Sequence, residues 1–204
     1  CREGRFVEQI VPVEVRAKGR TVAFDRDEHI RHDARREDFD ALKPVFRRDG
    51  GTVTAGNASG INDGAAALVL ATGAEVARSN LTPLARIVSW GHAGVDPAHM
   101  GMGPVPATRQ ALERAGLTVA DLDVIESNEA FAAQACAVAR ALDFDPARVN
   151  PNGSGISIGH PVGATGAINT VKAAYELRRS GGRHALVTMC IGGGQGIAAI
   201  LERA

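Results

Sequence analysis

The pattern of hydrophobic and polar positions changes near residue 61. Residues 1–60 are rich in charges and turn residues, with short strand-like stretches at 10–15 and 21–24. After residue 61, apolar runs of strand length alternate with Ala-rich stretches of helical length, which predict strands and helices in turn. The predicted strands of this second region are 65–71, 84–90, 122–126, 185–190 and 197–201, and its predicted helices are 74–79, 106–115, 130–142 and 163–179.

This alternation predicts an α/β fold of layered type, with a mixed sheet flanked by helices. Apolar strands that alternate with helices are typical of sheets buried on both faces. The last two predicted strands surround the Gly-rich segment 192–196, so we expect them to form an antiparallel hairpin. We also expect two regions: residues 1–60 as part of a loop or flap domain, and residues 61–204 as the layered domain.

Composition narrows the range of functions. Of the 204 residues, 45% are hydrophobic, and 23 basic residues balance 23 acidic ones. This is the composition of a folded globular protein. A net charge of zero argues against nucleic-acid and membrane-surface partners, which attract basic proteins. The basic run 31–36 contains Asp33 and is interpreted as a solvated face, with anion binding as the alternative.

The cysteine spacing and the N-terminal sequence bear on the cellular location of the protein. The cysteines at 1, 136 and 190 form neither a disulfide framework nor a metal-ligand spacing, and no metal site is expected. Without a signal peptide or an apolar membrane span, a cytoplasmic location is the expectation. The chain begins with Cys1 and reads like the interior of a longer protein. Cys136 is expected in the core of an apolar helix, and Cys1 is not expected to be a nucleophile.

Three blocks in the last third of the chain carry the candidate chemistry: 127–131, 150–166 and 189–196. They contain Asn128, His160 and Cys190, each at the end of an apolar run or among glycines. Glycine lets a ligand approach the backbone closely, so Gly-dense turns around a His and a Cys favour a site. From the residues alone, a structural role for His160 and a small core position for Cys190 remain open.

Two further motifs are rejected. Residues 155–159 fit the G-x-S-x-G nucleophile elbow, but that motif needs a strand leading into it and a helix starting at the serine. Here an Asn/Pro/Gly segment precedes it, and the next helix is expected only from residue 163. The glycines of 192–196 lack the G-x-G-x-x-G spacing of a dinucleotide loop.

The three blocks resemble the NEAF, GHP and CxGGG motifs of the thiolase superfamily, in the same order. The resemblance covers the chain and corresponds to the C-terminal half of that family. The run 153–166 and the ending CIGGGQGIAAILER look like bacterial β-ketothiolases of the acetyl-CoA acetyltransferase type. Such a resemblance implies ping-pong acyl transfer that interconverts two acyl-CoA units, such as acetyl-CoA, with a 3-ketoacyl-CoA and coenzyme A. It also implies a homodimer or homotetramer, coenzyme A thioesters as substrates, and no permanently bound cofactor.

The resemblance also implies residue roles. His160 would activate the nucleophilic cysteine and hydrogen-bond a thioester oxygen, and Asn128 would hold a water beside it. Cys190 would move the proton at the α-carbon, and the backbone N–H of Gly192 would donate to a second oxyanion hole. The implied coenzyme A contacts are Arg31, Phe46, Ala55, Ser59, Met100, Ala130 and Phe131. Asp38 and the Gly50-Gly51 pair depart from the family pattern near the adenine.

The family's acylated cysteine lies in a Cys-x-Ser-Gly context in its N-terminal half, and this sequence contains no such block. The missing N-terminal half is therefore the expected partner, and the 204-residue chain is expected to be inactive alone. The alternative is a non-catalytic coenzyme A-binding or assembly module with the same fold. A ketoacyl synthase would use two histidines, which the set of Asn128, His160 and Cys190 argues against.

Overall fold

The computed structural model describes residues 2–204, so the expectation for Cys1 lies outside the described residues. Its centre is a four-stranded sheet in the order β3-β6-β5-β4, formed by β3 (Ala85–Gly94), β4 (Val124–Ser127), β5 (His184–Gly192) and β6 (Gln195–Arg203). β4 and β5 are parallel, whereas β6 is antiparallel to both β5 and β3. The predicted terminal hairpin and mixed sheet are confirmed.

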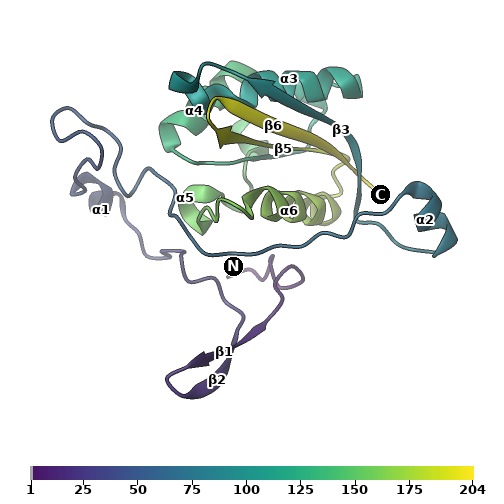
Figure 1. The fold of residues 1–204 in the computed structure, drawn as a ribbon, viewed down its shortest axis with the longest axis horizontal. Coiled ribbons are helices and arrows are strands. Elements are labelled where there is room, and N and C mark those ends of the chain that lie inside the picture. Colours follow the sequence, from purple (N-terminus) through teal and green to yellow (C-terminus); the bar gives the residue numbers. More distant parts are fainter. Residues whose placement is uncertain (1) are drawn as a thin grey trace.

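Helices cover both faces of this sheet (Figure 1). α3 (Pro104–Ala115) and α4 (Ala132–Leu142) lie on one face, and α6 (Thr165–Ser180) lies on the other. Proline at the start of α3 suits a first helical turn, and Gly116 and Gly181 end α3 and α6 at φ 66° and 75°. The remaining short elements are α1 (Arg36–Asp40), α2 (Gly73–Arg78), α5 (Gly155–Ile158), η1 (Pro97–Met102), η2 (Val119–Asp121) and η3 (Pro146–Arg148).

The two-residue period of β5 divides the core into two clusters. Leu186 packs with Leu112 and Val138 on the α3–α4 face, whereas Ala185 and Val187 pack with residues of α6 on the other face. Successive strand side chains point to opposite faces, so a strand buried on both sides must be apolar throughout. The α/β fold with a mixed sheet flanked by helices, predicted from the alternation of elements, is therefore confirmed.

The first part of the chain contributes a separate small hairpin. β1 (Val13–Ala17) pairs antiparallel with β2 (Arg20–Phe24), close to the two strand-like stretches predicted there. Lys18 and Gly19 form its turn with φ of 50° and 76°, the positive values that tight hairpins require. This hairpin projects away from the layered body (Figure 1).

Three sequence predictions are wrong. The first helix after residue 150 is the short α5 (Gly155–Ile158) rather than one that starts near residue 163, because Ser157 Oγ accepts from the Ser154 N–H and closes this turn. Residues 65–71 are not a strand: they run extended beside α6 without regular secondary structure, and Val69 is 96% exposed (Figure 1). An apolar run indicates burial but does not supply the hydrogen-bonded neighbour that a strand requires, and within residues 2–204 no strand pairs with this run.

The prediction for Cys136 is also wrong, because this cysteine is exposed on α4. Val138 and Leu142 turn toward the sheet, whereas Ala133, Cys136 and Arg140 lie on the outer face of the same helix. Alanine is tolerated on either face, so an Ala-rich helix does not reveal which side is buried. No helix in the described part of the chain is long and apolar enough to cross a membrane.

Candidate functional site

The carboxyl ends of β4 and β5 place two candidate residues at one edge of the sheet. Ser127 is in register with Thr188, and the backbone N–H of Asn128 donates to the Thr188 carbonyl oxygen at 3.0 Å. Cys190 follows Thr188 by two residues on β5. Because the strands are parallel, Asn128 and Cys190 lie at the same end of the pair.

The backbone of His160 is held by the segment around Asn62. Its N–H donates to the Gly60 carbonyl oxygen at 3.0 Å and to Oδ1 of Asn62 at 3.2 Å, and Ile61 forms a parallel bridge with His160. Gly159 has φ of 104°, and a Cβ there would lie 2.4 Å from Oδ1 of Asn62. A glycine before His160 is thus required by both conformation and space.

Hydrogen bonds fix the protonation of the His160 ring. Nδ1 lies 2.7 Å from Oγ1 of Thr165, and that hydroxyl donates its one proton to the Pro161 carbonyl oxygen at 2.9 Å. Oγ1 can therefore only accept from Nδ1–H, which leaves Nε2 of the neutral ring without a proton. Nδ2 of Asn128 lies 3.3 Å from Nε2 and donates to it.

Burial keeps this ring in its neutral form. Removal of the imidazole from water lowers the pKa of His160 below its ordinary value. Asn128 beside it is buried, and its Oδ1 has no hydrogen-bond partner among residues 2–204. A Cβ on Gly155 would approach this oxygen to 3.0 Å, so the glycine makes room for the amide. The arrangement offers a basic nitrogen next to a fixed amide.

The loop that leads to His160 is fastened to the end of β4. Asn150 accepts from Ser127 N–H through Oδ1 and donates to the Ser127 carbonyl oxygen through Nδ2, both at 2.9 Å. Ser154 Oγ donates to the same carbonyl oxygen at 3.2 Å. The carboxylate of Glu129 accepts from Asn150 Nδ2 at 3.2 Å and from Ile156 N at 3.3 Å. These contacts join the blocks that carry Asn128 and His160.

Cys190 is half-buried rather than sealed in a core. The β5–β6 register shifts between Cys190 and Gly192, and the next glycines adopt positive φ angles: 99° at Gly192, 60° at Gly193 and 83° at Gly194. A Cβ on Gly194 would lie 2.4 Å from the Val95 carbonyl oxygen. The turn therefore needs glycine for conformation and for packing. Convergence of Cys190 and Gly192 on His160 remains a prediction.

Two models of one family match the chain. The model described as thiolase, C-terminal domain, matches residues 81–203, and the model described as thiolase, N-terminal domain, matches residues 1–74. The chain belongs to the thiolase family. This match and the sheet of the layered domain agree with the resemblance seen in the three sequence blocks. The division at residues 60 and 61 remains a prediction.

Relatives of this thiolase chain are found among bacterial enzymes and solved structures. It is 68% identical over 202 residues to the beta-ketothiolase BktB of Cupriavidus necator, covering 99% of this chain and 51% of that protein. The acetyl-CoA acetyltransferase of Rhizobium meliloti is 55% identical over 204 residues, which cover 99% of this chain and 51% of that protein. The chain spans about half the length of the curated relatives it matches.

The fold of the thiolase chain is shared with solved structures. The crystal structure of the Bacillus anthracis acetyl-CoA acetyltransferase superposes with a TM-score of 0.97 at 48% identity, covering all of this chain and 51% of that chain. The crystal structure of human mitochondrial 3-ketoacyl-CoA thiolase in complex with CoA gives a TM-score of 0.89 at 44% identity, covering all of this chain and 50% of that chain. The expected thiolase-like fold is confirmed.

Four of the residues expected at coenzyme A lie together beside Asn128. Ser59 N–H donates to the Ala130 carbonyl oxygen at 3.0 Å, and Ala58 forms an antiparallel bridge with Phe131. The rings of Phe46 and Phe131 meet edge to face with centroids 6.3 Å apart. Phe46 is 72% exposed, so this aromatic pair presents an apolar edge at the surface.

The other three expected contacts are more scattered. Met100 belongs to η1, which lies against α4 through the 3.2 Å bond from Gln134 Nε2 to the Gly101 carbonyl oxygen. Arg31 and Ala55 are exposed on the segments before and after α1. Among the described contacts, none joins either of them to the Phe46–Phe131 pair.

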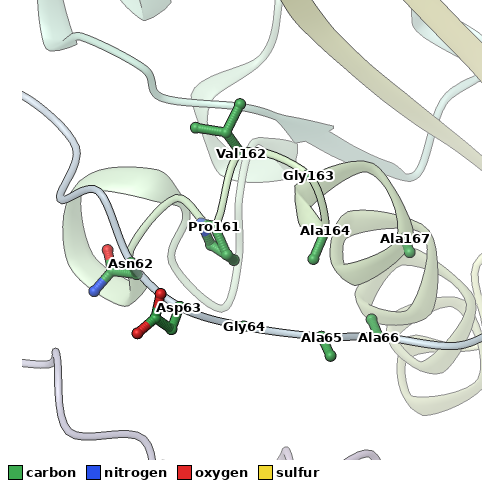
Figure 2. A pocket seen from close by; sticks show the side chains of 10 residues that line it. All are labelled: Asn62, Asp63, Gly64, Ala65, Ala66, Pro161, Val162, Gly163, Ala164 and Ala167. Carbon is green, nitrogen blue, oxygen red and sulfur yellow. The ribbon is translucent and has the colours of Figure 1, made fainter.

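Two cavities adjoin the site. One of about 540 Å³ lies between residues 62–66 and 161–167 and is lined by Asn62, Asp63 and Pro161 (Figure 2). The other, of about 2140 Å³, separates the N-terminal segment and residues 62–71 from α6. Neither is lined by Asn128, His160 or Cys190, so the cavities border the candidate residues without enclosing them.

Sequence reasoning missed Thr165 and Asn62, which hold the ring and the backbone of His160. Thr165 lies five residues after His160 in the Gly-rich block, and a hydroxyl at a helix start near a candidate His is a signal that was available. Asn62 is 98 residues away from His160, and its Nδ2 also lies 3.1 Å from Nδ1 of His29. No local pattern indicates such a contact.

Proposed function

We propose that the protein containing this chain is a β-ketothiolase of the acetyl-CoA acetyltransferase type. It would interconvert a 3-ketoacyl-CoA plus coenzyme A with acetyl-CoA and a shortened acyl-CoA. The observation that carries the proposal is the neutral His160 ring, whose proton is fixed on Nδ1 by Thr165 and whose free Nε2 meets Asn128. Membership of the thiolase family and the similarity to beta-ketothiolase BktB support the same reaction.

In this proposal, His160 Nε2 takes the proton of a nucleophilic cysteine and so supplies the thiolate. A free thiol is largely protonated at neutral pH, which makes a nearby base necessary. The thiolate attacks the 3-keto carbon, and the bond between C2 and C3 breaks. The electron pair of that bond goes to the departing acetyl-CoA as its enolate, and the acyl group stays on the cysteine.

Cys190 completes the proposed cycle. Its thiol donates a proton to the enolate carbon and becomes a thiolate. The incoming coenzyme A thiol gives its proton to that thiolate and attacks the acyl-cysteine. The cysteine sulfur leaves as a thiolate and takes back the proton held by His160, which regenerates all three groups. The Gly192 N–H would stabilise the charge on the substrate oxygen during these steps.

Substrate and assembly belong to the same proposal. The Phe46–Phe131 pair, with Ser59 and Ala130, would contact the pantetheine arm, and Arg31, Ala55 and Met100 would contact other parts of coenzyme A. The nucleophilic cysteine would come from the N-terminal half of a thiolase, since no Cys-x-Ser-Gly block occurs in this sequence. We further propose a homodimer or homotetramer that works in the cytoplasm.

A graft tests the proposed reaction. Residues 1–204 are joined in frame to the N-terminal half of BktB from Cupriavidus necator, and thiolysis of acetoacetyl-CoA is measured beside intact BktB. The same assay is run on the protein expressed from the complete reading frame of this chain. Turnover in both supports the proposal. A folded protein that binds coenzyme A without turnover would indicate the non-catalytic module instead.

A further inference from the structure

A buried ion pair lies beneath the candidate site. Lys172 on α6 and Glu126 on β4 meet at 2.5 Å between Nζ and Oε2, and their side chains are 4% and 0% exposed. Oε1 of Glu126 has no hydrogen-bond partner among residues 2–204. Removing two charges from water costs free energy that their attraction often fails to offset, so apolar residues would be as stable or more so. Stability therefore does not explain the pair.

Its connections suggest another role. Lys172 Nζ also donates to the Gly153 carbonyl oxygen at 2.7 Å. Gly153 lies in the loop that leads to His160, and Glu126 lies two residues before Asn128. One ammonium group therefore joins α6, the end of β4 and the loop. A cation that makes two charge-assisted bonds fixes its partners more firmly than a neutral donor.

The pair belongs to a buried polar stripe along α6. Thr165, Asn169, Lys172 and Glu176 follow each other at spacings of three and four residues, and all four are buried. Such spacing places them on one face of the helix. The stripe begins at Thr165, which holds the His160 ring, and ends at Glu176, which accepts from Asn152 Nδ2 at 2.8 Å. Polar contacts thus follow the loop on both sides of Lys172.

The charges around Glu126 make Lys172 essential to this arrangement. Burial raises the pKa of Glu126, as do the carboxylates of Glu176 and Glu129, while Lys172 opposes them. Removing it would leave a buried acid next to two other acids and would release the Gly153 carbonyl oxygen.

We propose that Lys172 is a positioning residue for the reaction. By tying Glu126 and Gly153 to α6, it fixes the contact between Asn128 and His160. This inference rests on the proposed thiolase function for its kinetic readout, although the geometry of the His160 ring tests it independently.

The first test replaces Lys172 in the protein expressed from its complete reading frame. Lys172→Met is expected to lower kcat about tenfold to a hundredfold while changing the KM for acetoacetyl-CoA much less, because misplacement of reacting groups acts on the chemical step. Lys172→Arg, which keeps a cation, should recover part of the rate. Arg178→Met is the matched control, since it removes an exposed cation from the same helix.

A second variant separates misplacement of the site from loss of folding. Glu126→Leu combined with Lys172→Met removes both charges and should be at least as stable to urea as the wild type. Its kcat should still be low, and the nitrogen NMR shifts of the His160 ring should move away from those of wild type and of Arg178→Met. Wild-type kcat and ring shifts in this double variant would overturn the inference. An inactive wild type would instead reject the proposed function, while the ring shifts still test the positioning.

Discussion

The side chain of Asn150 pairs with the backbone of Ser127 through both amide atoms, each at 2.9 Å. β4 has β5 on one side, and at its other edge Asn150 supplies the donor and acceptor that a neighbouring strand would provide. Ser127 is buried, and its N–H depends on this amide, whereas its carbonyl oxygen also accepts from Ser154 Oγ at 3.2 Å.

Asn150→Ala is therefore expected to destabilise the protein by about 1–3 kcal/mol, because the buried Ser127 N–H loses its partner and the carbonyl oxygen keeps only the bond from Ser154 Oγ. Urea unfolding of the expressed protein measures the change. Asn80→Ala is the matched control, since Asn80 has φ of 49°, close to the 47° of Asn150, but is exposed. Equal losses for the two variants would assign the effect to backbone conformation alone.

Thr165→Val keeps the shape of the side chain and removes the acceptor of the His160 Nδ1 proton. The neutral ring should then populate both tautomers, and kcat should fall by about tenfold to a hundredfold, as when a partner that orients a functional histidine is lost. Nitrogen NMR of the ring and steady-state kinetics measure the two effects. Thr165→Ser retains the hydroxyl and should keep both properties; a single tautomer in Thr165→Val would contradict the assignment.

The pH dependence of stability should reveal the buried state of His160. Burial lowers the pKa of its ring, so the unfolded chain binds a proton more readily than the folded one. The free energy of unfolding should thus fall as the pH drops below about 6.5, the ordinary value for histidine. Urea unfolding at several pH values gives this free energy. It should change more steeply with pH in the wild type than in His160→Asn.

The titration of Glu126 should change the free energy of unfolding in the opposite direction, lowering it as the pH rises. Burial raises its pKa from 4.5 to about 7, so between these values the folded state holds the proton more tightly. Its contribution makes the protein less stable as the pH rises through this window, by roughly 3 kcal/mol. Glu126→Gln cannot titrate, and its stability relative to the wild type should improve from pH 4.5 to 7. A constant difference across this window would show that Glu126 does not titrate there.

The proposed chemistry separates Cys190 from His160. Cys190→Ala should abolish exchange of the α-protons of acetyl-CoA with deuterium while still allowing acylation of the nucleophilic cysteine. His160→Ala should impair acylation itself, with losses of about 10²–10⁴-fold for a positioned acid or base. Proton NMR of acetyl-CoA and mass spectrometry of the acylated protein distinguish the two. Normal exchange in Cys190→Ala would remove Cys190 from the mechanism.

Periodicity predicted the elements around the site because each strand and helix carries its own burial pattern. The glycines around His160 and Cys190 also pointed to those residues, since conformation and close packing there exclude side chains. The hydrophobic pattern of a segment does not show which other elements pair with it or pack against it. The pattern therefore predicts a strand at 65–71 and a core position for Cys136, and the structure contradicts both.

The polar residues that hold the site in place could not be predicted from the sequence either. Asn62, Glu126 and Lys172 act through residues far away in the sequence, and a lysine on a helix normally indicates a solvent-exposed face. Only the packing of α6 against β4 shows that Lys172 is buried. The roles of the site residues in catalysis remain predictions.

The parallel pairing of β4 and β5 also sets the order in which this region can fold. β5 and β6 are joined by a tight turn and need only local contacts, whereas Val124 meets Ala185 after closure of a loop of roughly sixty residues. Local hairpins form quickly, and long-range pairs form late. An intermediate that contains the hairpin but not β4 would present Cys190 without Asn128 beside its strand, so a chain could be largely structured before it has a site.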